Sequence, residues 1–220
     1  MTRLAYLHTV AGLAGTFKSL SDELLKGIDI FHMVDESLLQ NTIRANQLSK
    51  TTIRRLCGYL AFAEEAGAEV IMVTCSSMGP AVELGRALVN VPVLRVDEPM
   101  AELAVQTGAR IGVAATLQTT LNPTADLIRR TASKQGKTVE VVSKLCEGAF
   151  QAVIAGDTTR HDEIVSAGLN ELIPQVEVIV LAQASMARVV ESLPQETRSI
   201  PILSSPRLAV EHLAQFIAKM

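Results

Sequence analysis

Several residue types and patterns are scarce in this chain of 220 residues, and each scarcity excludes a class of protein. Tryptophan is missing and aromatic residues make up only 3% of the sequence, so stacking surfaces for nucleobases or a nicotinamide ring are not expected. No apolar run approaches the roughly 18 residues of a membrane-spanning helix. The net charge is −3, so basic residues are not in excess. We therefore expect neither nucleic acid nor a membrane as a partner.

Patterns that hold metals or phosphates are also missing. No cysteine and histidine residues have the spacing of zinc ligands, and the loop that begins at His8 lacks G-x-G-x-x-G, so we expect no metal and no cofactor. Three cysteines, Cys57, Cys75 and Cys146, lie far apart, which is typical of a reducing compartment. The first residues run straight into an expected strand without a signal peptide pattern. These features predict a soluble, cytoplasmic protein.

One cysteine lies at the end of an apolar strand. Val70–Val73 predicts a buried parallel strand, and it ends in Thr74-Cys75-Ser76-Ser77 before a helical pattern. Parallel sheets bind ligands beyond the carboxyl ends of their strands, and helix N-terminal amides lower the pKa of a thiol. An isolated cysteine at such a turn is more often simply buried. Here the chain repeats the pattern, which favours a functional interpretation.

The repeat lies 108 residues further along, in Glu177-Val178-Ile179-Val180-Leu181-Ala182-Gln183-Ala184-Ser185-Met186. It matches Glu69-Val70-Ile71 and Ser77-Met78, and it places Gln183 where the first copy has Cys75. Two other strand ends also recur, at offsets of 107 and 111 residues: Thr9 corresponds to Thr116, and Glu36 to Glu147. Three junctions in the same order indicate a duplicated α/β unit.

The duplication predicts an α/β fold of two similar Rossmann-like (flavodoxin-like) lobes, each with a parallel sheet. We expect the first lobe over residues 1–96 and the second over 97–205, with 206–220 returning to the first; one continuous sheet is the alternative. The carboxyl edges of the two lobes would then face one cleft, with Cys75 and Gln183 on its two sides. Expected elements include short strands over 29–31 and 91–94, a long helix from Asn41 to Ala66, and a helix capped by Asn122-Pro123. Helical spacing assigns Cys57 to packing.

These motifs together resemble the aspartate/glutamate racemase family, which includes hydantoin racemases, maleate isomerases and arylmalonate decarboxylases. The resemblance covers nearly the whole chain. It implies an isomerase that uses no cofactor, in which two thiols exchange protons on opposite faces of the carbon α to a small carboxylate. Cys75 would be the first thiol. By the same resemblance the substrate-binding residues are His8, Thr9, Ser76, Ser77, Thr116, Thr119, Ala184 and Ser185.

The chain departs from the family where the second thiol should be. Gln183 occupies that position, and an amide neither gives nor accepts a proton at neutral pH. A single thiol is enough for one-face proton transfer or for decarboxylation of a malonate-like acid, and Gln183 would hydrogen-bond a carboxylate or an oxyanion. A second base would have to come from elsewhere, with His32 and Cys146 as the candidates besides His8.

Three other points stay open in the sequence. His32 with Asp35 and Glu36 forms either an acid-base cluster or a loop that caps a helix. A binding protein for a small carboxylate that has lost catalysis is the alternative to an enzyme. A homo-oligomer, dimeric or larger, is compatible with the apolar face of the last expected helix.

Overall fold

The computed structural model describes residues 1–193 and 199–220. The chain divides into two compact units, Met1–Glu98 with Pro206–Met220, and Pro99–Ser205. Each unit contains one four-stranded, fully parallel sheet, in the order β2-β1-β3-β4 in the first and β6-β5-β7-β8 in the second. The identical strand order confirms the α/β fold of two similar parallel-sheet lobes. No helix within the described residues is long and apolar enough to span a membrane.

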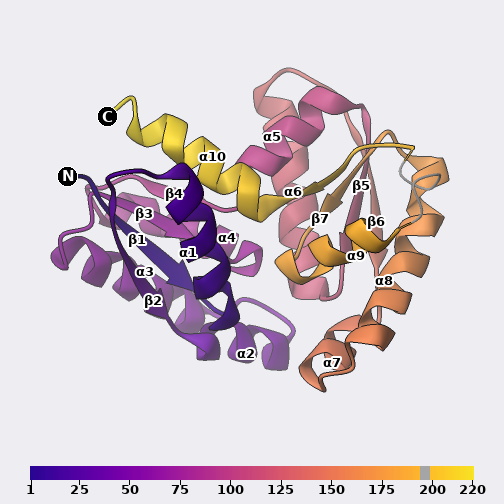
Figure 1. Cartoon of the computed structure of the whole chain (residues 1–220), viewed down its shortest axis with the longest axis horizontal. Helices are drawn as coiled ribbons and strands as arrows, with labels where there is room; N and C mark the ends of the chain where they lie inside the picture. The colour runs from indigo at the N-terminus through magenta and orange to yellow at the C-terminus, as the bar shows by residue number, and fades with distance from the viewer. Residues whose placement is uncertain (194–198) are drawn as a thin grey trace. The chain divides into compact units, whose positions relative to one another are not determined.

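The first unit alternates strands and helices from its first residues (Figure 1). Its elements are β1 (Arg3–His8), α1 (Gly12–Leu24), β2 (Asp29–Val34), α2 (Glu36–Ala45), α3 (Lys50–Glu65), β3 (Val70–Val73), the 3₁₀ turn η1 (Ser76–Met78), α4 (Gly79–Gly85), η2 (Arg86–Leu88), β4 (Val93–Arg95) and most of α10 (Ser205–Ile217). Helices cover both faces of the sheet, so β1 and β3 are apolar on both sides.

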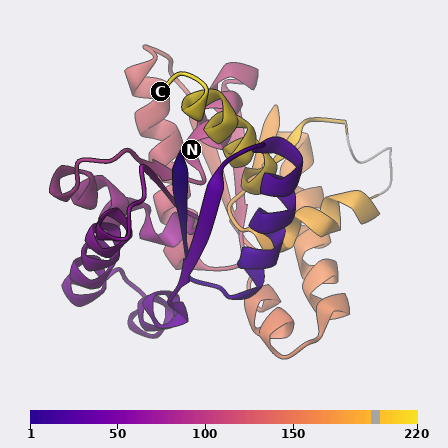
Figure 2. The same cartoon turned by 60° about the vertical axis from the view of Figure 1, so that its left-hand side comes forward.

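The two faces of the first sheet have separate cores. One face packs against α2, α3 and α4, through residues such as Leu56, Leu60 and Val82. On the other face, Tyr6 of β1 and Phe17 of α1 form a core with Val210 of α10. Figure 2 shows the course of α1 in indigo and of α10 in yellow. The last helix of the chain therefore completes the core of the unit that the chain began.

The second unit, Pro99–Ser205, repeats this alternation of strands and helices. Its elements are α5 (Glu98–Thr107), β5 (Arg110–Ala115), α6 (Gln118–Lys134), β6 (Glu140–Leu145), α7 (Ala149–Ile154), α8 (Thr158–Leu172), η3 (Ile173–Gln175), β7 (Val178–Leu181), η4 (Ala184–Met186), α9 (Ala187–Ser192) and β8 (Ile202–Ser204). One face of the sheet packs its apolar side chains against Val165 and Leu169 of α8 and Val189 of α9. Helix α6 packs on β5 and β6.

Several expected boundaries were wrong. The single helix from Asn41 to Ala66 is two helices, because Asn46 adopts a left-handed conformation (φ 49°) that ends α2, and the Ser49 hydroxyl then caps α3 by accepting from the Thr52 amide at 3.1 Å. Strand β2 continues through Val34, so His32 lies inside a strand and not in a loop.

Two boundaries near the carboxyl edges were also misplaced. Strand β4 runs over Val93–Arg95, two residues later than expected, which places Arg95 in the sheet. Helix α6 begins at Gln118 instead of Asn122, with Pro123 inside it, so Thr119 lies in the first turn. Because proline has no amide proton, Pro123 cannot donate to the carbonyl of Thr119, four residues before it in the helix.

Candidate functional site

Cys75 lies where the sequence predicts, directly beyond the carboxyl end of β3. It is the residue before η1, its backbone is extended (φ −129°, ψ 113°), and its thiol is free and half-buried. Burial raises the pKa of this thiol above its ordinary value. The Thr9 and Ser77 hydroxyls and the Ser77 and Met78 amides, which lie near the sulfur, act in the opposite direction. Cys75 is therefore protonated at rest, with donors in place that favour the thiolate when it forms.

Thr9 contributes to this cluster from the neighbouring strand end. Because the Thr74 amide donates to the Leu7 carbonyl at 3.0 Å, the chain leaves β1 and β3 side by side. The Thr9 hydroxyl oxygen is buried and has no hydrogen-bond partner in the described part of the chain. That hydroxyl is therefore free to donate to the Cys75 sulfur.

His8 lies beneath Thr74 and does not reach the surface. Its Nδ1 is 2.8 Å from the Thr74 hydroxyl, and that hydroxyl donates to the Leu7 carbonyl at 3.2 Å. The single Thr74 hydroxyl proton is thus used, so His8 Nδ1 must be the donor. His8 Nε2 is 2.9 Å from His32 Nδ1. Burial and the adjacent His32 lower the pKa of His8 to about 4, so it is neutral and its Nε2 accepts from His32.

Two expectations change as a result. Both ring nitrogens of His8 are occupied, so no hydrogen-bonding atom of this side chain remains for a substrate. His32 keeps only its Nε2 for other partners, and burial followed by the charge of Lys18 lowers its pKa. Asp35 accepts from the Ser37 amide as the cap of α2, which is the helix-capping role that the sequence left open for this segment.

Gln183 occupies in the second unit the local position that Cys75 has in the first. It precedes η4 with nearly the same backbone angles (φ −133°, ψ 139°). Its Oε1 accepts from the Thr116 amide at 2.6 Å, and its Nε2 donates to the Thr116 hydroxyl at 2.7 Å. Thr116 corresponds to Thr9 in the repeat. The amide therefore holds a fixed orientation, with one Nε2 proton and the Thr116 hydroxyl proton left to donate.

The other predicted substrate-binding residues differ in exposure. Ser76 and Ser77 are buried in η1, Ala184 is half-buried and Ser185 is exposed. The Thr119 hydroxyl is buried without a hydrogen-bond partner among the described residues. Its position in the first turn of α6 places it near amides that lack partners inside the helix. Thr119 is thus free to donate, while Thr116 is held by Gln183.

The other two cysteines pack inside the units. Cys146 is 2% exposed, lies in the core of the second unit, and burial raises its pKa to about 11. These properties do not favour Cys146 as a second base. Cys57 is half-buried on α3, and its sulfur lies beside Gly85 of α4, which agrees with the packing role that helical spacing predicts. In residues 1–193 and 199–220, no group of three or more histidine, cysteine, aspartate or glutamate side chains is placed to hold a metal ion.

Sequence reasoning missed a buried pair of charges next to this site. Arg95 ends β4 and its guanidinium binds the carboxylate of Asp97. The signal was present, because residues two apart on an extended chain point to the same face, and opposite charges at that spacing after an apolar strand suit a buried ion pair.

The comparisons with known proteins identify a family and a shared fold. A model of the Asp/Glu/hydantoin racemase family matches residues 13–213. Among solved structures, glutamate racemase RacE1 from Bacillus anthracis superposes with a TM-score of 0.79 at 17% identity, over 99% of this chain and 82% of that one. Allantoin racemase from Klebsiella pneumoniae gives 0.72 at 17% identity, over 100% and 89%. Glutamate racemase from Aquifex pyrophilus gives 0.72 at 21% identity, over 98% and 84%. No curated protein sequence matches the chain significantly.

Proposed function

The chain belongs to the Asp/Glu/hydantoin racemase family, and we propose that it is an isomerase without a cofactor that transfers a proton at the carbon α to the carboxylate of a small acid. The acid is an amino, hydroxy or dicarboxylic acid. Glutamate and allantoin racemases have the same fold. The three cysteines are free thiols, which suits a reducing compartment such as the cytoplasm.

The observation that carries the proposal is the set of donors around Cys75. Two hydroxyls and two backbone amides favour its thiolate, while burial favours the thiol. A group whose two protonation states are both supported is suited to removing a proton from carbon and to returning one. The Thr9 hydroxyl is buried without a hydrogen-bond partner among the described residues, so its proton is free to donate to the thiolate when it forms.

Gln183 has a different role in the proposal. Thr116 holds both polar atoms of its side chain, so Gln183 keeps a fixed orientation and carries no exchangeable charge. We assign Gln183, with the Thr116 and Thr119 hydroxyls, to binding a substrate carboxylate or the oxyanion that forms when the α proton leaves. Ser76, Ser77, Ala184 and Ser185 complete the proposed binding residues. His8 serves by holding Thr74 in place.

The second candidate function is decarboxylation of a malonate-like acid. It is favoured by one observation, the amide at the position of the second thiol. Loss of carbon dioxide leaves an enediolate that needs a proton on one face only, and Cys75 alone supplies it. A protein that binds a carboxylate without turnover would keep the binding residues and make no use of the thiol.

Proton NMR in deuterated water tests the proposal directly. The enzyme is incubated with separate panels of single-enantiomer amino acids, hydroxy acids and substituted malonates, and Cys75→Ala is the control. Exchange of the α proton that disappears in Cys75→Ala supports the isomerase, with inversion or retention read from the product. Release of carbon dioxide with deuterium in the product supports the decarboxylase. Saturable binding without exchange by the wild type would contradict both enzyme assignments.

A further inference from the structure

Two charged side chains are buried in the first unit at the carboxyl end of β4. Arg95 is 2% exposed and Asp97 is fully buried. Moving an ion from water into a protein interior is costly unless it is paired and its hydrogen bonds are satisfied. A charge pair at this depth next to a reactive cysteine therefore calls for a role.

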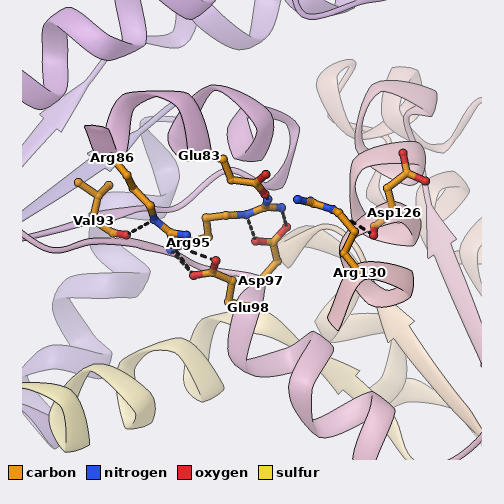
Figure 3. Close-up of polar contacts among 8 residues, drawn as sticks. All are labelled: Glu83, Arg86, Val93, Arg95, Asp97, Glu98, Asp126 and Arg130. Atoms are coloured by element: carbon orange, nitrogen blue, oxygen red, sulfur yellow. Dashed lines mark hydrogen bonds and ion pairs between the residues drawn. The ribbon is translucent and has the colours of Figure 1, made fainter. Parts of the chain in front are cut away.

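The pair is a two-point fork. Arg95 Nε donates to Asp97 Oδ1 at 2.9 Å and Nη2 donates to Asp97 Oδ2 at 2.8 Å, as Figure 3 shows. The third nitrogen, Nη1, donates to Glu83 on α4. A planar guanidinium held at three nitrogens has little freedom to move. The fork thus links the end of β4 to α4.

The guanidinium also lies against the backbone that follows Cys75. Gly79 begins α4, and a Cβ at this position would overlap the Arg95 guanidinium. The Gly79 amide donates to the Ser76 carbonyl at the end of η1. Arg95 therefore touches the backbone one residue beyond the amides of Ser77 and Met78, which favour the Cys75 thiolate. The Met78 amide also donates to the Cys75 carbonyl at 3.0 Å.

The sheet brings these two segments together. Val73 pairs with Arg95 in the register of β3 and β4, and the Val96 amide donates to the Val73 carbonyl at 3.1 Å. The turn that carries Cys75 and the turn that carries Asp97 consequently leave neighbouring strands at the same level.

From this geometry we propose that the Arg95–Asp97 fork is a positioning element that fixes η1 against the end of β4 and holds the Ser77 and Met78 amides on the Cys75 sulfur. The inference deepens the proposed function, since it concerns the same thiol. It requires only that Cys75 be reactive, not that any particular acid be the substrate.

If Arg95 acts by positioning the backbone, its variants should behave differently than if it acts through its charge. The influences on the Cys75 thiol are burial and hydrogen bonds, with no charged side chain among them. Arg95 acts in this proposal through the backbone and not by direct attraction of the thiolate. Arg95→Lys keeps the positive charge but cannot form the fork, whereas Arg95→Met loses both.

The test is the pH dependence of Cys75 alkylation by iodoacetamide, measured by peptide mass spectrometry so that Cys57 and Cys146 are counted separately. We expect the pH at which alkylation reaches half of its maximal rate, the midpoint, to rise by roughly one pH unit in Arg95→Lys and in Arg95→Met. A shift of this size corresponds to the loss of about one hydrogen bond to a charged acceptor. Arg207→Lys is the matched control, because Arg207 forms a similar fork with Glu23, at 2.9 and 2.8 Å, on the surface of the same unit. Its midpoint should equal that of the wild type.

An unchanged midpoint in folded Arg95→Lys and Arg95→Met would overturn the proposal, as would a shift in Arg95→Met alone, which would indicate a charge effect. If both variants fail to fold, the double variant Arg95→Met/Asp97→Leu takes their place, since replacing both members of a buried pair by apolar residues often preserves stability. A raised midpoint in that folded variant supports the positioning role, and a wild-type midpoint rejects it. Because alkylation needs no turnover, a chain that is inactive on every acid still gives a clear result.

Discussion

His8 Nε2 lies 2.9 Å from His32 Nδ1, and the two imidazole rings meet edge to edge, with an angle of 15° between their planes and their centroids 5.2 Å apart. Tyr6 stacks on the same group, at 5.8 Å from His8 and 5.4 Å from His32. The short nitrogen contact allows one proton between the rings and not two. The pair therefore makes the first unit sensitive to acid.

Stability should fall as the pH is lowered through the range in which this pair resists protonation. The pKa of His8 is lowered to about 4 in the folded protein, against an ordinary value of 6.5, so the unfolded chain binds the proton first. The free energy of unfolding should decrease from about pH 6.5 downward, by roughly 2–3 kcal/mol on reaching pH 4. Urea unfolding across this range measures the loss.

The variant His8→Asn should remove much of that pH dependence, because an amide can still donate to Thr74 but does not titrate. His212→Asn, which alters a histidine of α10 outside the pair, is the control and should keep it. A pH dependence that persists unchanged in His8→Asn would mean that other groups cause the acid sensitivity.

Cys75→Ala should abolish turnover. The proposed proton carrier is lost, and general acid-base steps contribute roughly 10²- to 10⁴-fold, so the rate of α-proton exchange should fall at least that far. Cys146→Ala is the matched control because Cys146 is buried in a core with a raised pKa, and it should retain most of the exchange rate. The opposite ranking of the two variants would identify Cys146 as the acting thiol.

Gln183→Cys should add a second thiol at the matching turn and introduce exchange with inversion on a chiral acid. Its control is Gln183→Ala, which frees the Thr116 amide and hydroxyl from their partner. Leaving such groups unpaired costs roughly 1–3 kcal/mol, so Gln183→Ala should lower the rate or affinity about ten- to a hundredfold. If the wild type already inverts its substrate as fast as Gln183→Cys, a base other than residue 183 serves the second face, and His32 becomes the residue to test.

Gly168→Ala should destabilise the second unit by about 1–3 kcal/mol. A Cβ at this position of α8 would lie 2.6 Å from the Cys146 sulfur, so the core becomes overpacked. Removing that sulfur should relieve the contact, and the double variant Gly168→Ala/Cys146→Ala should be at least as stable as Cys146→Ala because alanine favours a helix over glycine. Thermal unfolding of the wild type, the two single variants and the double variant measures how strongly the effects of the two substitutions depend on each other. Additive effects would show that the sulfur is not what limits position 168.

The sequence was most informative where one signal repeats. The strand before Cys75 and the strand before Gln183 both begin with Val-Ile and are followed by the same serine-methionine turn, and the backbone is extended at both Cys75 and Gln183. The duplication predicted two parallel sheets, and both are present with one strand order. Such strands can be recognised in the sequence because burial of both faces of the sheet requires nearly every residue of the strand to be apolar.

Side-chain pairing was harder to read. Asn46 divides a helical region through its left-handed backbone, a conformation that many asparagines do not adopt. His32 was expected in a loop because a histidine in a buried strand has no evident partner until His8 is placed beside it. Arg95 was passed over for the same reason. The partners of these residues are set by strand register, which local sequence does not contain.

Helix α10 has a consequence for the order in which the chain acquires its structure. Ala209, Val210 and Leu213 fill the core of the unit that begins at residue 1, whereas the second unit is one continuous segment. During synthesis the later-made unit has all of its residues available while the earlier-made unit still lacks one wall of its core. We therefore expect the amino-terminal unit to complete its core only after α10 has been made, and a chain without α10 should expose the part of the apolar face that this helix covers.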